Sequence, residues 1–360
     1  NVVLLGTSYN GENSTWNYYV DDSGNNSNNG LTSSAPWATL VYAISQAVDG
    51  TATTLNVGAG TYTEHSVNVN KSNLTIKGAG SSSTIFDANT NNQFLAITAS
   101  DVTIEAIKIK DYVSDDNSSD NAYAGAAIRV GAVEGTRYAT SSLSGITLKD
   151  IYFEDNITSS YGGDGGAVHV NNNSSATTTL TISGCIFDGN QTTSTSGYAH
   201  GGAFTLNSGN VVTIENSVFF NNHAYKAGGA IAFYGDGSST LTINNSTFYN
   251  NEGKANSCTQ CNAQIVVSGS GTQAYINNSI LYESDPDDSY HEDIIARYSA
   301  AITVRNSIVE RTDDYSSGSI STSSVSNSNP NWTDPANNDF SLPDDSPAVD
   351  TASSTYAPAD

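Results

Sequence analysis

Arg129 and His169 are the residues whose types and positions could carry chemistry in this sequence. Each is the fourth residue after a glycine that opens a short apolar strand, which predicts neighbouring places in one outward-facing column. With Asp164 and Lys149 nearby in the sequence, the four could supply a base and a cation to stabilise an anionic intermediate. They are the candidate catalytic residues. The alternative is an ordinary arginine and histidine on a solvated strand face.

Two acidic stretches interrupt the sequence pattern, and clustered carboxylates of this kind could bind calcium. Neither stretch has the ligand spacing of an EF-hand loop, so ordinary solvated loops are the alternative. Calcium is the one cofactor that the sequence suggests. The candidate ligands are Asp115, Asp116, Asp120, Asp285, Asp287 and Asp288.

Cys258 and Cys261 form a single Cys-x-x-Cys in a polar stretch. A structural zinc site would need a second pair of ligands, so we predict a local disulfide and an oxidising compartment. Cys185 takes the place of a small residue in a repeated phrase, which predicts that it is buried and inert.

The charge balance excludes two classes of partner. The 360 residues contain 36 Asp and Glu against 12 Lys and Arg, a formal net charge of -24. This charge would be repelled by the phosphates of nucleic acids and of anionic membranes. No apolar run reaches the roughly 18 residues that span a bilayer, so membrane insertion is not expected.

A repeated phrase organises the chain and would position these side chains. Its clearest copy is Leu241-Thr-Ile-Asn-Asn-Ser-Thr-Phe-Tyr-Asn-Asn251, and the eight starts are spaced by 28, 44, 34, 32, 29, 33 and 28 residues. A repeat of this length cannot bury its own apolar face, so the copies must stack. Each copy offers three short strands and no helix. The sequence therefore predicts an all-β parallel β-helix with three strands per coil. The starts are Leu74, Val102, Ile146, Leu180, Val212, Leu241, Ala274 and Ile302.

Strand alternation fixes which side chains face the core. Leu241 and Ile243 should point inward and Thr242 outward. The phenylalanines of the phrase should stack in an inner column about 4.8 Å apart. Asparagines recur at two positions, and both series are predicted to form hydrogen-bonded ladders at the corners of the coil. The phenylalanines are Phe153, Phe187, Phe219 and Phe248; the first asparagine series is Asn156, Asn190, Asn222 and Asn251, and the second is Asn216, Asn245, Asn278 and Asn306.

The ends of the chain differ from the repeats, which gives four segments. Residues 17–52 should form an N-terminal cap with an amphipathic helix that Ser34 caps ahead of Pro36. Residues 53–325 form the β-helix, and the proline-rich residues 326–360 should cover the final coil. Residues 1–16 are an extended leader whose apolar run could pair on the outside of its own β-helix or supply a strand to another copy. That run is Val2, Val3, Leu4 and Leu5.

Three stretches resemble known proteins. The pattern from Tyr19 to Tyr62, with Gly24, Gly30 and Pro36, resembles the N-terminal part of secreted right-handed parallel β-helix proteins. The Gly-Gly-Ala-Ile and Phe-x-x-Asn phrases resemble the repeats of chlamydial polymorphic outer-membrane proteins. The stretch from Asp334 to Asp350 is similar to the closing segment of bacterial surface β-helix proteins with exchangeable C-terminal anchors. The resemblance implies a right-handed coil and an extracellular, secreted or cell-surface location.

Proteins of this architecture include polysaccharide lyases, glycoside hydrolases and adhesins, so the fold alone does not decide function. The first hypothesis is a structural or adhesive protein, such as a filament subunit, whose partners are other copies of itself or surface glycans. The second is a polysaccharide lyase or hydrolase acting on an extracellular glycan. The third is a non-catalytic glycan-binding module that uses exposed tyrosines. Whether the protein is an enzyme stays open, with a non-enzymatic role favoured.

Overall fold

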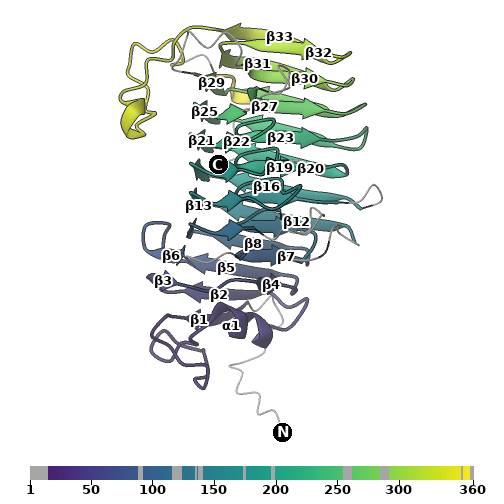
Figure 1. Ribbon diagram of the computed structural model, residues 1–360. Coiled ribbons are helices and arrows are strands. Elements are labelled where there is room, and N and C mark those ends of the chain that lie inside the picture. Colours follow the sequence, from purple (N-terminus) through teal and green to yellow (C-terminus); the bar gives the residue numbers. More distant parts are fainter. Residues whose placement is uncertain are drawn as a thin grey trace.

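The chain folds into a right-handed parallel β-helix, which confirms the fold predicted from the repeats (Figure 1). The computed structural model describes residues 15–87, 92–115, 124–133, 136, 141–172, 176–195, 199–253, 262–283, 292–349 and 352–356. Within them, three parallel sheets form the three faces of a rod of stacked coils. No helix of these residues is both long enough and apolar enough to cross a membrane.

Sheet A has 19 strands in the described residues and contains two kinds of strand. The Leu-Thr-Ile strands and their equivalents are β1 (Trp16–Val20), β2 (Thr53–Val57), β5 (Leu74–Gly78), β8 (Val102–Glu105), β12 (Leu143–Lys149), β16 (Thr178–Ser183), β20 (Asn210–Glu215), β24 (Thr240–Asn244), β28 (Gln273–Asn277), β31 (Ala301–Val309) and β33 (Ser319–Ser326). The strands that follow the corner are β3 (Gly60–Tyr62), β6 (Thr84–Asp87), β9 (Lys108–Lys110), β13 (Tyr152–Glu154), β17 (Ile186–Asp188), β21 (Val218–Phe220), β25 (Thr247–Tyr249) and β29 (Ile280–Tyr282).

The other two faces are shorter. Sheet B has nine described strands: β4 (Val67–Val69), β7 (Leu95–Ile97), β11 (Ile128–Val130), β15 (Val168–Val170), β19 (Phe204–Leu206), β23 (Ile231–Tyr234), β27 (Ala263–Ser268), β30 (Glu292–Arg297) and β32 (Thr312–Tyr315). Sheet C has five: β10 (Val113–Ser114), β14 (Ile157–Thr158), β18 (Gln191–Thr192), β22 (His223–Ala224) and β26 (Glu252–Gly253).

The interior is filled as strand alternation predicts. Leu241 and Ile243 are fully buried, whereas Thr242 between them is partly exposed. The phenylalanine column is present, with centroids of successive rings 4.5, 4.4 and 4.7 Å apart and nearly parallel planes. Each ring therefore lies against the ring of the next coil, and in-register pairing of the strands fixes this spacing. The stacked rings are Phe153, Phe187, Phe219 and Phe248.

Asparagine side chains link consecutive coils beneath the turn that follows each phenylalanine strand. The Nδ2 of Asn156 donates to the Oδ1 of Asn190 at 2.9 Å, and the same contact repeats to Asn222 at 3.0 Å and to Asn251 at 2.7 Å. All four side chains are fully buried. Each Nδ2 also donates to a backbone carbonyl of sheet A, so the ladder satisfies polar groups that could not reach water.

The second asparagine series marks the corner inside sheet A. Asn216, Asn245, Asn278 and Asn306 all have left-handed backbone conformations, with φ between 48° and 50°. The expected turn is therefore present. Side-chain hydrogen bonds between coils at this corner involve the serines that follow: Ser217 Oγ accepts from the amide of Cys185, and the contact repeats along Ser246, Ser279 and Ser307. In this series the asparagines supply the turn, and the serines supply the ladder.

The Gly-Gly pairs have separate roles. The first glycine of each pair (Gly165, Gly201 and Gly228) has a φ near +65°, which L side chains rarely adopt. The second glycine has no room for a side chain, because a Cβ on Gly202 would overlap the carbonyl oxygen of Gly229 in the next coil. The motif therefore makes the turn and also lets consecutive coils approach closely.

The N-terminal end of the rod is closed by a short helix. Helix α1 (Leu40–Gln46) buries Leu40, Ala43 and Ile44 over the first coil. Thr39 is its N-cap, so the prediction that Ser34 begins the helix was wrong. The reason is local: residues 31–36 form turns, and the Trp37 ring fills the space beside Tyr18 at 4.8 Å.

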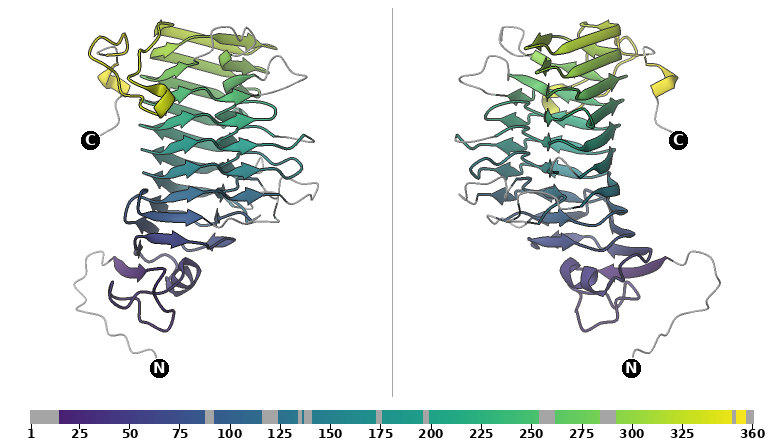
Figure 2. Two further views of the ribbon diagram at one scale, coloured as in Figure 1. Left: turned by 60° about the vertical axis from the view of Figure 1, so that its left-hand side comes forward. Right: turned by 90° about the vertical axis from the view of Figure 1, so that its right-hand side faces the viewer.

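The C-terminal segment lies along the flank of the rod (Figure 2). Trp332 and Phe340 pack against Phe220 and Tyr249, several coils back from the end of the β-helix. This placement differs from the expected cover over the final coil. The proline-rich chain cannot extend the ladder, and the aromatic side chains of β21 and β25 offer it an apolar surface on the side.

Candidate functional site

Arg129 and His169 are register partners on β11 and β15, so the column predicted from the sequence exists. Both side chains are fully buried, and the expectation of a solvated face was wrong. The Arg129 guanidinium donates to the carbonyl of Thr136, which lies outside the sheet. The column continues with buried small and apolar residues. Those residues are Thr205, Ala232, Val266 and Ile295.

Asp164 contacts a histidine other than the one expected. Its Oδ1 accepts hydrogen bonds from the amide of His200 at 2.9 Å and lies 3.0 Å from His200 Nδ1. The His200 ring packs on Tyr234, whose hydroxyl accepts from the Arg297 guanidinium at 2.8 Å. These residues form a polar layer over sheet B, in which Asp164 and Arg297 are buried and His200 and Tyr234 are half-buried.

Burial sets the charge state of His169. It lowers the pKa of the imidazole to about 3, and the nearby Arg129 lowers it further while Asp164 opposes the shift. A neutral ring at physiological pH fits its environment, in which Nε2 lies 3.3 Å from the Asn207 amide nitrogen. Arg129 and His169 are both fully buried, so neither of these two side chains is accessible to a polysaccharide. Lys149 is exposed on β12 of sheet A, so the structure does not bring it to the other three.

An accessible charged cluster lies elsewhere, on the outer face of β9, β13 and β17. The central residues of these strands, Ile109, Phe153 and Phe187, are fully buried. Alternation therefore turns the flanking residues outward in two columns. One column contains Lys108, Tyr152 and Ile186, and the other contains Lys110, Glu154 and Asp188.

The cluster is tightly connected. Lys108 Nζ lies 2.9 Å from Glu154 Oε2 and 4.1 Å above the centre of the Tyr152 ring. The Tyr152 hydroxyl donates to Asp188 Oδ2 at 2.8 Å. Lys110 pairs with Asp111 at 2.8 Å and with Asp87 at 3.3 Å. Both lysines are thus already matched by carboxylates of the protein.

Burial raises the pKa of two carboxyl groups at this cluster. Burial raises the pKa of Asp188, and the charges of Asp155 and Glu154 raise it further, whereas the Tyr152 hydrogen bond opposes the shift. Burial also raises the pKa of Asp155, with Asp111 and Glu154 adding to it. Beside Asp188 stands Glu154, which is ion-paired with Lys108. A protonatable carboxyl next to a lysine-paired carboxylate is an arrangement suited to acid–base chemistry.

Aromatic residues continue the Asp188 column toward the C-terminal end. Phe220 is the register partner of Asp188, and Tyr249 and Tyr282 follow on β25 and β29. Phe340 of the C-terminal segment lies 5.3 Å from Phe220 between ring centroids. Within the described residues, the segment therefore packs over Phe220 and Tyr249, and Lys108, Lys110 and Glu154 stay partly exposed.

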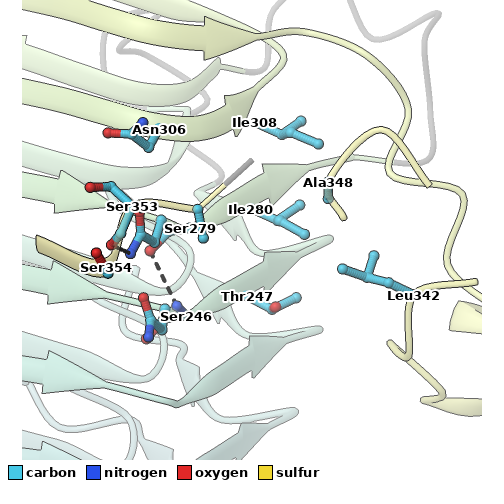
Figure 3. Close-up of a pocket in the computed structure, with 13 residues that line it drawn as sticks. Ser246, Thr247, Ser279, Ile280, Asn306, Ile308, Leu342, Ala348, Ser353 and Ser354 are labelled. Carbon is cyan, nitrogen blue, oxygen red and sulfur yellow. Dashed lines mark hydrogen bonds between the residues drawn. The ribbon is translucent and has the colours of Figure 1, made fainter. Parts of the chain in front are cut away.

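A pocket of about 380 Å³ lies between the corner of sheet A and the C-terminal segment (Figure 3). Asn278 anchors that segment, because its amide donates to the Ser353 carbonyl and accepts from the Ser353 amide, both at 2.9 Å. The lining consists of asparagine, serine, threonine and apolar residues. None of them ionises near neutral pH, so this pocket lacks an acid or base.

Several sequence-predicted residues lie outside the described residues: Val2, Val3, Leu4, Leu5, Asp116, Asp120, Cys258, Cys261, Asp285, Asp287 and Asp288. Asp115 is described and is half-buried. Within the described ranges, no three His, Cys, Asp or Glu side chains form a group that could hold a metal ion. The calcium and disulfide predictions therefore stay predictions.

Sequence reasoning missed Lys108, Tyr152, Glu154 and Asp188. The signal was available, because aligning the phrases places the residues on either side of each phenylalanine on the outer face. The residues singled out from the sequence, Arg129 and His169, lie on sheet B instead.

Comparison with known proteins supports the fold. The chain superposes on the PL6 family alginate lyase AlyGC with a TM-score of 0.51 and 16% identity, over 87% of this chain and 39% of that chain. Other similar structures are the pectate lyase Pel9A (TM-score 0.48, 15% identity, 92% and 88% covered) and the pectin methylesterase PemA from Erwinia chrysanthemi (0.39, 13%, 84% and 81%). No protein-family model and no curated protein matches the sequence.

The alginate lyase likeness, together with the sheet topology, defines a right-handed parallel β-helix protein. This chain spans about two fifths of that enzyme's length. At 16% identity the likeness concerns the fold, and activity has to be argued from the chain's own side chains.

Proposed function

We propose that this protein acts outside the cell on a polysaccharide and hydrolyses a glycosidic bond at Glu154 and Asp188. The observation that carries the proposal is the register of these two residues on adjacent strands, with a raised pKa on Asp188 and a lysine partner on Glu154. Glycoside hydrolysis uses two carboxyl groups, one as acid and one as base or nucleophile.

The environment assigns the roles. Asp188, whose pKa is raised, is the general acid that protonates the leaving oxygen. Glu154 is the carboxylate that activates water or attacks the sugar, and Lys108 holds it in place. Tyr152 positions Asp188 by a hydrogen bond to Oδ2, which leaves Oδ1 for the transferred proton.

The charges favour a neutral glycan over a polyanion. The chain carries a net charge of -24, and an acidic polymer would need a basic groove. Lys108 and Lys110 are both paired with carboxylates, so neither is available to neutralise a uronate or stabilise an enolate-like intermediate. Hydrolysis of a neutral chain is therefore better supported than lyase chemistry.

A polysaccharide panel with two readouts tests the proposal. Neutral and uronate polymers are incubated with the protein, and new reducing ends and the absorbance of unsaturated products are measured separately. We expect reducing ends without unsaturation, and loss of activity in Asp188→Asn and in Glu154→Gln. Glu215→Gln on β20 is the matched control, because it removes one carboxylate of the same rod outside the cluster.

Two outcomes would contradict the proposal. Unsaturated products would identify a lyase, and full activity in Asp188→Asn would place the chemistry elsewhere. If no polymer is cleaved, the structural, adhesive or glycan-binding roles expected from the sequence are favoured instead.

A further inference from the structure

The C-terminal end of the rod has a free strand edge. β33 pairs with β31 along one side, and no described residue pairs with its other side. β32 is in the same position at the end of sheet B, where it pairs with β30. Figures 1 and 2 show both strands at one end of the rod, beyond all the others.

The C-terminal segment does not close this end in the described residues. Its anchors are Trp332 and Phe340 on the flank at Tyr249, and Ser353 on Asn278. The two ends of the rod are therefore unlike. Helix α1 and Trp37 cover the first coil, whereas the side chains of the last coil face solvent.

The inward-facing side chains of β33 are less buried than the residues at the same positions in the coil before it. Ile320 is the register partner of buried Ile302 and is only half-buried. Thr322 is the register partner of buried Val304 and is exposed. A further strand stacked on these two residues would complete the burial that every inner coil has.

The composition of β33 permits such pairing. Its sequence, Ser-Ile-Ser-Thr-Ser-Ser-Val-Ser, contains no charge and no proline over eight residues. Natural proteins usually protect a long edge with lysine, proline or a covering element. β32 does carry charges, Asp313 and Asp314. Two chains of net charge -24 therefore repel each other less at the uncharged edge of β33 than at the acidic edge of β32.

We propose that a second copy of this chain adds a strand to the free edge of β33, and that the donated strand is Val2–Leu5. Four consecutive apolar residues give two side chains on each face in either register, so one pair can cover Ile320 while the other faces outward. The ten residues between Leu5 and β1 can span roughly 33 Å, which separates the donated strand from the closed N-terminal end.

Strand addition of this kind joins unlike surfaces. The N-terminal strand of one copy binds the C-terminal edge of the next, so the contact is heterologous and joins copies head to tail, as a filament or, where the rotation between copies closes, as a ring. The proposal is independent of the Glu154 and Asp188 chemistry, which lies on the flank of the rod.

Complementary variants of the full chain test the proposal. Thr322→Lys blocks the accepting edge with an inward-facing charge and keeps the donor strand. Val3→Asp with Leu4→Asp blocks the donor and keeps the edge. Mass is measured by light scattering after size-exclusion chromatography. We expect concentration-dependent multimers from the unmodified chain, monomers from either variant alone, and a 1:1 dimer when the two variants are mixed.

The matched control is Ser321→Lys, which places the same charge on the same strand but on the outer face beside Thr303. It should assemble like the unmodified chain. Circular dichroism of each variant checks that the β-helix is intact. A monomeric unmodified chain at every concentration would overturn the proposal. So would assembly that survives both blocking variants, since it would place the contact at another surface.

Discussion

Gln264 donates a hydrogen bond of 2.6 Å to Asp293, and this contact extends the buried ladder beyond its four asparagines. Asn251 donates to Gln264 at 2.8 Å, so the chain of side chains runs unbroken from Asn156 to Asp293. Asp293 then accepts from the amides of Glu310 and Arg311. The ladder thus ends in a buried carboxyl group that receives three donors.

Asp293 should make stability depend on pH. Burial raises its pKa to about 7, against the effect of its three donors. A raised folded-state pKa means that the folded chain binds a proton that the unfolded chain has released. The stabilisation is complete below pH 4 and is lost as pH rises to 7. The stability of the unmodified chain relative to Asp293→Asn should fall across this window by up to roughly 4 kcal/mol.

Urea unfolding of both proteins at several pH values measures this difference. Asp313→Asn, which alters an exposed carboxylate on β32, is the control and should show no such trend against the unmodified chain. A relative stability that is constant or increases between pH 4 and pH 7 would show that the Asp293 pKa is not raised.

The middle of the ladder should be sensitive to truncation. Asn222→Ala removes the Oδ1 that accepts from both the backbone and the side-chain amide of Asn190, and the Nδ2 that donates to the Phe187 carbonyl and to Asn251; the Asn190 backbone amide is left buried without this acceptor. Each buried group without a partner costs about 1–3 kcal/mol, so we expect a loss of roughly 3 kcal/mol. Chemical unfolding measures it. Asn70→Ala at an exposed position should change stability by less than about 0.5 kcal/mol, and an equal effect in both would refute a special role of the ladder.

Tyr152 should tune the pH profile of hydrolysis. Its hydrogen bond lowers the pKa of Asp188 against the effect of burial, so Tyr152→Phe should raise that pKa further. If Asp188 acts as the acid, the alkaline limb of kcat/KM then moves to higher pH. Tyr161→Phe, at an exposed tyrosine, is the control. A limb that moves to lower pH, or does not move, would remove Asp188 from the role of acid.

The fold could be predicted because its determinants are local and repeated. Spacing of the phrases gives the coils, and alternation gives the inward position of Phe219 and the outward position of Thr242. The extension of the ladder through Gln264 could not be predicted, because that side chain comes from a strand of sheet B and has a different type. The column that contains Arg129 was predicted correctly, but its burial was not. Period-two alternation identifies which side chains point out of a sheet, but it does not show whether another segment of the chain covers them.

Consecutive coils approach each other closely at the Gly-Gly pairs. A Cβ on Gly202 would overlap backbone atoms of Gly229 and His223, and backbone cannot move aside as a side chain can. Gly202→Ala should therefore destabilise the rod by roughly 3 kcal/mol, at the upper end of the usual cost of overpacking. Gly237→Ala is the matched control, because nothing lies within 4 Å of its added Cβ and its φ is not positive. Chemical unfolding of the two variants compares them directly. Equal stabilities would show that the coils can separate locally at low cost, and that the second glycine of each pair is not required for stacking.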